Sequence, residues 1–410
     1  MRRGLLVAVL TTSLAITGLA TALPAQAAGP IDDSQFGMHV PQISQGVDPG
    51  TSYGTIRLWD SGVAWGQVQQ TKKKYWWVGL DSAISNANGQ GAEISYVLGS
   101  TPTWAASNKK QGTYPNKGAA SVPSSKDWKN WVKTVVKRYG ASIESYQIWN
   151  EANLKTFWEG TPKQMAKLTK DAYTIIRKYD PTAKVVSASS TVRLNSAYKK
   201  FFPKYLKELK KLKWPIDAVA VHLYPPGTGT PATRAGYITK VQKDMKKAKV
   251  PARMQLWDTE INYGIAGPSP TKGMKIDGPA AAAWVAQTYL DDIRLGVDRA
   301  YWYYWYPNTS LVGIQMIDGS PGAIGYQTVH DWLTNAYYTC TSGPVNACQL
   351  GDNVDPKVIA WASTASGTFT VPANATITCD ALNQCTPVTP GSQVTIGSMP
   401  QWFGTPAPVE

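Results

Sequence analysis

Two glutamates lie at the ends of β-type runs, each beside a side chain that can form hydrogen bonds. Glu151 follows Asn150, and Glu260 follows Thr259. Either acid alone is typical of a surface loop or of a salt bridge in the core. Two carboxyl groups about 5–5.5 Å apart across one cleft can instead cleave a glycosidic bond with retention: one protonates the leaving oxygen and the other attacks the anomeric carbon. The pair, with Trp and Asn near both acids, favours this chemistry.

The chain pattern explains how two distant acids could meet. Helix-type stretches separate eight short β-type runs, which predicts a (β/α)8 barrel over residues 28–337. The expected strands are Phe36–Val40, Thr55–Asp60, Ala92–Gly99, Ile143–Trp149, Lys184–Ser189, Ile216–Tyr224, Arg253–Glu260 and Arg299–Tyr306. The expected helices are Tyr75–Asn88, Ser125–Tyr139, Pro162–Tyr179, Asn195–Leu212, Thr233–Lys247, Gly278–Gly296 and Gly322–Ala336. Barrel chemistry sits where strands end, and the acids follow the fourth and seventh runs.

The helical pattern stops near residue 338, and Thr, Ser, Gly, Val and Pro dominate the remaining chain. Short runs such as Val358–Ala362, Gly367–Val371 and Gln393–Ile396 predict a β-sheet or sandwich subdomain over 338–410. All four cysteines fall there, and their spacing favours two local disulfides, Cys340–Cys348 and Cys379–Cys385. Zinc is the weaker alternative because neither pair has C-x-x-C spacing and no His is nearby.

The N-terminus reads as a targeting segment. Arg2 and Arg3 precede an apolar stretch, and an Ala-Gln-Ala cleavage motif ends at Ala27. This predicts a signal peptide over 1–27, with a secreted mature chain. A membrane anchor is the alternative, but the apolar stretch is short for one. No later stretch is long and apolar enough to span a bilayer.

The segment 148–153, which reads IWNEAN, resembles the Asn-Glu signature of the large clan of retaining barrel glycosidases. The segment 256–260, LWDTE, resembles the clan's nucleophile strand. Within that clan the chain is most similar to the family 39 and family 5 groups, which include β-xylosidase-like enzymes and endo-glycanases. The resemblance implies Glu151 as acid/base, Asn150 as partner of the sugar 2-hydroxyl, and Glu260 as nucleophile. Asp258 competes as nucleophile, since alternate residues of a regular strand share a face; we favour Glu260 because it lies nearer the barrel mouth.

Other polar residues at strand ends are candidates for substrate binding. The clan places an Arg at the position of Arg57, where it would lower the pKa of the nucleophile; a salt bridge that plugs the barrel is the alternative. His222 and Tyr224 share a strand face and resemble the clan's polar pair beside the nucleophile.

Aromatic side chains are the expected sugar platforms. The chain has 17 Trp and 21 Tyr but only 6 Phe, an excess of rings with polar atoms. Trp305 is the preferred platform over Trp302 in the eighth run, with core packing as the alternative. Trp104 and Trp59 are further candidates, and His39 could also line the cleft.

Charge and composition limit the partners. The sequence predicts no cofactor, and with only three His it argues against a multi-His metal site. The formal net charge is +14, and Lys residues are concentrated at 199–213 and 240–249 on two outer helices. These are solvated helix faces, or they attract an anionic polymer or cell-wall surface. A glycosidase cleft argues against nucleic acid as the partner, and a monomer is expected.

The preferred interpretation is a secreted retaining glycoside hydrolase, xylosidase-like or an endo-glycanase. The alternatives are a non-catalytic carbohydrate-binding barrel, which has no need for both glutamates, and a basic cell-surface adhesin that uses the Lys-rich helices.

Overall fold

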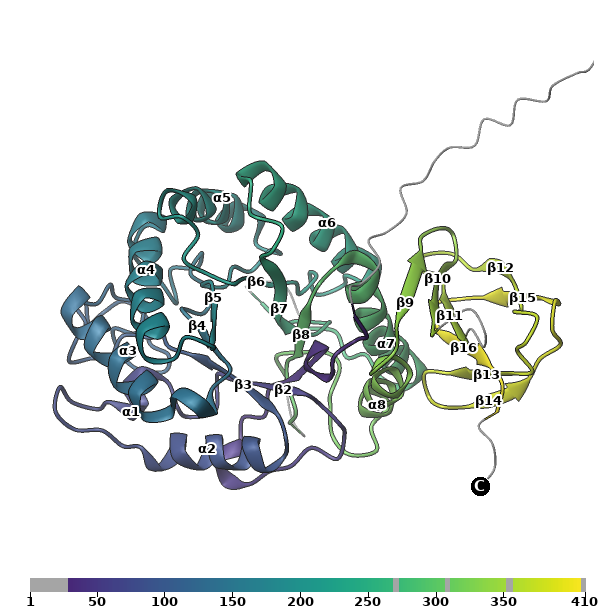
Figure 1. Cartoon of the computed structure of the whole chain (residues 1–410), viewed down its shortest axis with the longest axis horizontal. Coiled ribbons are helices and arrows are strands. Elements are labelled where there is room, and N and C mark those ends of the chain that lie inside the picture. Colours follow the sequence, from purple (N-terminus) through teal and green to yellow (C-terminus); the bar gives the residue numbers. More distant parts are fainter. Residues whose placement is uncertain (1–28, 268–272, 307–309, 352–356, 407–410) are drawn as a thin grey trace, which may run out of the picture.

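Eight parallel strands close into a barrel in the computed structural model, which describes residues 29–267, 273–306, 310–351 and 357–406 (Figure 1). Each strand pairs with the next in sequence, and β1 pairs with β8 to close the ring. The strands are β1 Phe36–Met38, β2 Thr55–Leu58, β3 Glu93–Val97, β4 Ser145–Gln147, β5 Lys184–Val186, β6 Ala218–His222, β7 Gln255–Ile261 and β8 Arg299–Trp302. The predicted barrel is confirmed; the predicted signal peptide, 1–27, lies outside the described residues.

Helices surround the barrel, as Figure 1 shows. They are α1 Trp65–Val68, α2 Val78–Gly89, α3 Ser125–Tyr139, α4 Pro162–Tyr179, α5 Asn195–Lys211, α6 Pro231–Ala248, α7 Gly278–Leu295 and α8 Pro321–Leu333, with 3₁₀ turns at Asp33–Gln35, Ile43–Gln45 and Gly140–Ser142. Sequence chemistry explains the boundaries. Thr161 and Gln164 form a capping box across the first turn that begins at Pro162, so α4 begins where predicted. Helix α2 begins at Val78, three residues later than predicted, and Tyr75 and Trp77 stack on each other just before it.

The barrel interior is filled by side chains rather than solvent. Val186, Ala218, Ala220, Trp257 and Tyr301 are fully buried and pack together. Above them, polar residues near the strand ends face a cleft. Across the described residues no helix meets the length and hydropathy that a membrane crossing needs.

The C-terminal region is entirely antiparallel. One sheet has the order β14-β13-β16-β11-β10-β9, and β12 pairs with β15 in a second. The strands are β9 Tyr338–Thr341, β10 Asn346–Leu350, β11 Lys357–Trp361, β12 Gly367–Thr370, β13 Ile377–Asp380, β14 Cys385–Pro387, β15 Gln393–Ile396 and β16 Gln401–Gly404. Both predicted disulfides are confirmed, since each cysteine faces its partner across a strand pair.

This region packs against α7 and α8 of the barrel, away from the cleft (Figure 1). Arg294 of α7 donates to Ser342 at 2.7 Å and lies 6.0 Å from the Trp361 ring. Cys340, Cys348 and Trp361 belong to the same buried core as the barrel helices. The C-terminal sheets therefore support the helical layer rather than the site.

Candidate active site

Glu151 and Glu260 meet at the mouth of the barrel. Glu151 lies four residues beyond the end of β4, with a positive φ of 38°, and its backbone N–H donates to the Ser189 hydroxyl at 2.9 Å. Glu260 lies within β7 and is 6% exposed. One carboxylate oxygen of each acid and one ring nitrogen of His222 all lie within 4.8 Å of one another. The structure thus brings together two acids that are more than a hundred residues apart in sequence.

Arg57 connects the β4 and β7 sides of the site. It is 1% exposed, and its Nη1 donates to Glu260 Oε1 at 2.7 Å. Its Nη2 donates to Asn150 Oδ1 at 2.8 Å, and its Nε donates to Gln147 Oε1 at 2.6 Å. A planar guanidinium held at three points fixes both Asn150 and Glu260. Sequence reasoning missed Gln147, although its position two residues before Trp149 on the fourth run was a usable signal.

His222 lies between the two acids. Its Nδ1 is 3.1 Å from Glu151 Oε1 and 3.2 Å from Glu260 Oε2. Burial lowers the pKa of His222 to about 3, so the ring is neutral near pH 7. Tyr224 donates its hydroxyl to Glu260 Oε2 at 3.1 Å, and burial holds the pKa of that phenol well above its ordinary value.

Both acids are buried, and nearby groups oppose the rise in pKa that burial causes. Burial raises the pKa of Glu151 to about 7, with Arg193, Thr191 and Arg57 opposing the shift. Burial also raises the pKa of Glu260, although His222 and Arg57 oppose the shift. Arg57 therefore acts in the predicted direction and lowers the pKa of Glu260, but desolvation outweighs it and the net shift is upward. Arg57 and Tyr224 nevertheless donate directly to Glu260, which favours its ionised form.

Asp258 does not face the cleft. It accepts hydrogen bonds from Arg234 of α6 at 2.7 and 3.1 Å, on the helix side of β7. The expectation that Asp258 and Glu260 share a face is wrong, because β7 is irregular. Val221 pairs with Asp258 but His222 pairs with Glu260, so Thr259 is an extra residue in the ladder. Such a bulge reverses the alternation of side chains.

The sequence profile of glycosyl hydrolases family 39 matches residues 63–305, which is more than half of the chain. The chain belongs to this family. It is similar to a β-xylosidase of Caldicellulosiruptor saccharolyticus, with 26% identity over 247 residues that cover 55% of this chain and 48% of that protein. The chain thus spans about half the length of this curated relative.

Solved structures of family 39 share the fold. A family 39 glycoside hydrolase from Bacteroides cellulosilyticus WH2 has a TM-score of 0.70 and 18% identity, covering 92% of this chain and 82% of that chain. A family 39 β-xylosidase from Caulobacter crescentus has a TM-score of 0.66 and 17% identity, covering 93% and 98%. At this identity the likeness establishes the architecture.

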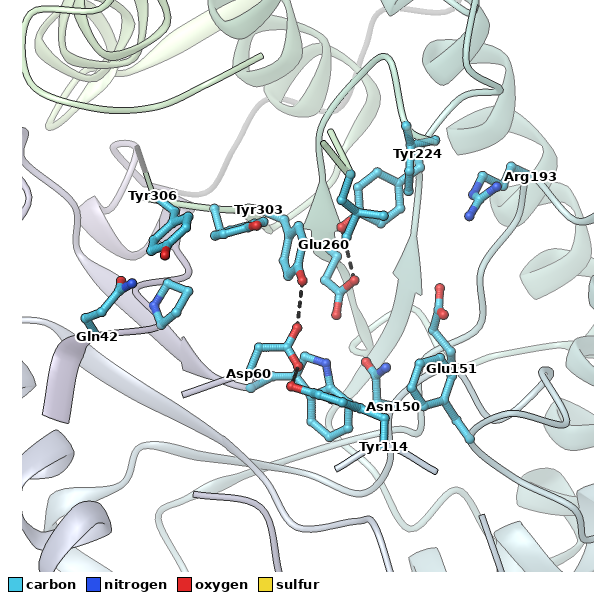
Figure 2. A pocket seen from close by; sticks show the side chains of 16 residues that line it. Gln42, Asp60, Tyr114, Asn150, Glu151, Arg193, Tyr224, Glu260, Tyr303 and Tyr306 are labelled. Atoms are coloured by element: carbon cyan, nitrogen blue, oxygen red, sulfur yellow. Dashed lines mark hydrogen bonds between the residues drawn. The ribbon is translucent and has the colours of Figure 1, made fainter. Parts of the chain in front are cut away.

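In this family 39 chain the acids open into a cleft of about 580 Å³. Figure 2 shows Arg193 and Glu151 at one end of it, Glu260 and Asp60 near the middle, and Gln42 and Tyr306 at the other end. The lining residues are Pro41, Gln42, Trp59, Asp60, Tyr114, Asn150, Glu151, Phe157, Arg193, Tyr224, Glu260, Ile265, Tyr303, Tyr304, Tyr306 and Leu311. Aromatic walls with a few polar groups are the usual composition of a sugar site.

Asp60 and Tyr303 were missed by the sequence reasoning. Asp60 follows β2 and accepts hydrogen bonds from the hydroxyls of Tyr303, at 2.7 Å, and Tyr114. Burial raises the pKa of Asp60, while these two hydroxyls oppose the shift. The signal was available, because Asp60 follows Trp59 at a strand end.

Two predicted platforms lie elsewhere. Trp305 is 6% exposed, packs in the main core and donates its backbone N–H to the His39 carbonyl. The eighth strand ends at Trp302 rather than at the predicted Tyr306, so strand alternation does not carry Trp305 into the cleft. Trp104 packs edge-on against Trp65 and donates to the Gln69 carbonyl at 2.9 Å. Of the Trp candidates, Trp59 is the one that lines the cleft.

His39 is also buried, with Nε2 3.0 Å from the Thr259 carbonyl oxygen. Within the described residues, Glu151, His222 and Glu260 could offer three donor atoms to a metal ion. Arg57 already places a positive charge 2.7 Å from Glu260, where a bound cation would add a second one. The donor set is therefore better suited to proton transfer and nucleophilic attack than to metal binding.

Proposed function

We propose that this chain is a retaining glycoside hydrolase in which Glu151 is the acid/base and Glu260 is the nucleophile. The observation that carries the proposal is the short distance between their carboxylate oxygens, which lie within 4.8 Å of each other. Retaining enzymes hold these groups about 5–5.5 Å apart so that one attacks carbon directly, whereas inverting enzymes leave about 6.5–9.5 Å for a water molecule.

The environments of the acids support distinct roles. Glu151, with a pKa of about 7, is protonated in a useful fraction of molecules near neutral pH and can give its proton to the glycosidic oxygen. Glu260 accepts hydrogen bonds from Arg57 and Tyr224, which stabilise the carboxylate that must attack. Pairs of acids whose surroundings separate their roles in this way are typical of glycosidases.

The reaction then has two balanced steps. A Glu260 oxygen bonds to the anomeric carbon while the leaving oxygen takes the Glu151 proton and departs as an alcohol. Glu151, now a carboxylate, removes a proton from water, and that water attacks the anomeric carbon. The ester bond to Glu260 breaks, and the released sugar keeps its anomeric configuration. Asn150, fixed by Arg57, is placed to bind the sugar 2-hydroxyl.

A β-xyloside is the first substrate to test, because the curated relative is a β-xylosidase. The cleft of about 580 Å³ admits either an exo-acting xylosidase-like mode or an endo-glycanase mode. The leader pattern and two disulfides support export of the enzyme.

A leaving-group series tests the role of Glu151. Glu151→Ala should lose about 10²–10⁴-fold in rate on poor leaving groups, which need a proton, and much less on dinitrophenyl glycosides. Azide, which attacks without a base, should restore turnover and yield a β-glycosyl azide from a β-glycoside. Glu159→Ala removes an acid from the same β4–α4 connection at a residue that does not line the cleft, and as a matched control it should show no azide rescue. Equal loss on all leaving groups without rescue would contradict this role.

A further inference from the structure

A second hollow, which we call the basic groove, adjoins the cleft at Arg193. This groove of about 780 Å³ lies between the β4–α4 and β5–α5 connections. Arg193 lines both the cleft and the groove, so the two hollows meet at this side chain. Ala152 and Asn153, which directly follow Glu151, form part of its wall.

The groove is positively charged. Lys155, Arg193 and Lys200 contribute to its lining, and within the described lining there is no Asp or Glu. The first turn of α5 also faces the groove, through Asn195, Ser196 and Ala197. The N-cap residue Leu194 provides no side-chain hydrogen bond to the N–H groups of that turn. A helix N-terminus without a cap adds to the attraction for an anion.

Arg193 has capacity for a ligand. Its Nη1 donates to the Gly267 carbonyl at 2.6 Å, which holds the guanidinium in place. The same side chain lines both the cleft and the groove. A guanidinium held in place at such a position is well suited to a carboxylate or a sulfate.

The position of the groove indicates which part of the substrate would reach it. The sugar that becomes attached to the enzyme must contact Glu260, while the group that leaves lies beyond the acid that protonates it. In Figure 2 Arg193 lies at the Glu151 end of the cleft, on the far side from Asp60. A leaving group that extends past Glu151 therefore meets Arg193 first.

We propose that the leaving-group side of the substrate carries an anionic substituent, a carboxylate or a sulfate ester on a sugar, that Arg193, Lys155 and Lys200 bind. This inference rests on the proposed function, because it assigns the leaving-group side from the role of Glu151. It assigns a binding role to Lys200, which belongs both to the Lys-rich segment 199–213 and to the lining of the groove.

Matched aryl β-xylosides test the inference. The 3-carboxyphenyl and 3-carbamoylphenyl xylosides differ in charge but little in leaving-group ability. The wild-type ratio of kcat/KM, anionic over neutral, should be about 10-fold or more, the scale of a charge-assisted hydrogen bond. It should fall as salt is added. A second pair, 3-sulfophenyl and 3-sulfamoylphenyl xylosides, distinguishes sulfate-like from carboxylate recognition by which pair gives the larger ratio.

Variants locate the effect. Arg193→Gln should bring the ratio close to one, Arg193→Lys should keep part of it, and Lys200→Gln should lower it less. Lys210→Gln removes the same charge from the same helix outside the groove and should leave the ratio unchanged. A wild-type ratio of one, or a ratio that survives Arg193→Gln, overturns the inference while turnover of the neutral xyloside still supports the proposed function. If neither member of a pair is hydrolysed, the choice of a β-xyloside as substrate fails and the inference fails with it.

Discussion

Two buried arginines each form an ion pair with an acid of β7, but one ion pair borders the cleft and the other is enclosed by the fold. Arg57 binds Glu260 at the barrel mouth, and Arg234 binds Asp258 at 2.7 Å and Asp292 at 2.6 Å between β7 and the helices. Each arginine is 1% exposed. Glu260 and Asp258 are two residues apart, yet one opens to the cleft and the other is sealed.

The difference lies in what remains free after pairing. Arg234 donates to Asp258, Asp292 and the Thr288 carbonyl. Asp258 also accepts a hydrogen bond from the Leu223 N–H, so other protein groups surround this ion pair. Arg57 engages only Oε1 of Glu260, leaving Oε2 with Tyr224 and His222 beside Glu151. A closed ion pair supports the fold, whereas an open one presents an oxygen to a substrate.

The first prediction separates the two acids of β7 by the property they affect. Glu260→Ala should reduce kcat on the order of 10⁴-fold or more, because no covalent intermediate can form, with little change in Tm. Asp258→Ala should instead lower the free energy of unfolding by about 3–5 kcal/mol, since it leaves Arg234 short of a partner. Rates per folded molecule and denaturant unfolding curves measure both. A stable but inactive Asp258→Ala protein would reverse the assignment.

The second prediction extends the comparison to two tryptophans. Trp305→Ala should destabilise the protein by about 3–5 kcal/mol, because the ring is in the core. Trp59→Ala should weaken substrate binding by roughly 1–3 kcal/mol, as for loss of a large aromatic contact. Michaelis constants and melting curves of the two variants provide the test. A Trp305→Ala protein of normal stability with a raised KM would place Trp305 at the substrate.

The third prediction concerns pH. Burial places the pKa of Glu151 at about 7, and its protonated form is the one that donates. The value of kcat/KM should therefore fall as pH rises through about 7, and this limb should be absent in Glu151→Gln. The same raised pKa means that the folded protein holds a proton that the unfolded chain has lost between about pH 4.3 and 7. Ionisation of Glu151 thus reduces stability as pH rises across that window, and Glu151→Gln should weaken this dependence. An alkaline limb that persists in Glu151→Gln would assign it to another group.

Much of the architecture could be predicted from the sequence, because a parallel barrel requires β-type and helix-type runs to alternate along the chain. The strand-end rule then selected Arg57, Asn150, Glu151, His222 and Glu260, which the structure places in contact with one another or close together. Their catalytic roles remain predictions. The two local disulfides were also accessible, because each links neighbouring strands across a short loop.

The errors arose where local regularity breaks down. Nothing in the segment LWDTE reveals the extra residue Thr259, so alternation placed Asp258 on the wrong face. Nothing in the aromatic run 301–306 indicates that the strand ends at Trp302. The sequence therefore predicted Trp305 as the platform, whereas Tyr303 is the residue that lines the cleft. Asp60 follows Trp59 at a strand end, but its hydroxyl partners, Tyr114 and Tyr303, lie far from it in sequence, and local patterns do not reveal such contacts.

Covalent trapping tests the central claim most directly. A 2-deoxy-2-fluoro β-xyloside with a dinitrophenyl leaving group should inactivate the enzyme with one sugar per molecule, because the fluorine slows hydrolysis of the intermediate more than a good leaving group slows its formation. Peptide mapping by mass spectrometry should place the sugar on Glu260, and the Glu260→Ala variant should remain unlabelled. A sugar attached to Asp258 or Asp60, or stoichiometric labelling of Glu260→Ala, would contradict the account.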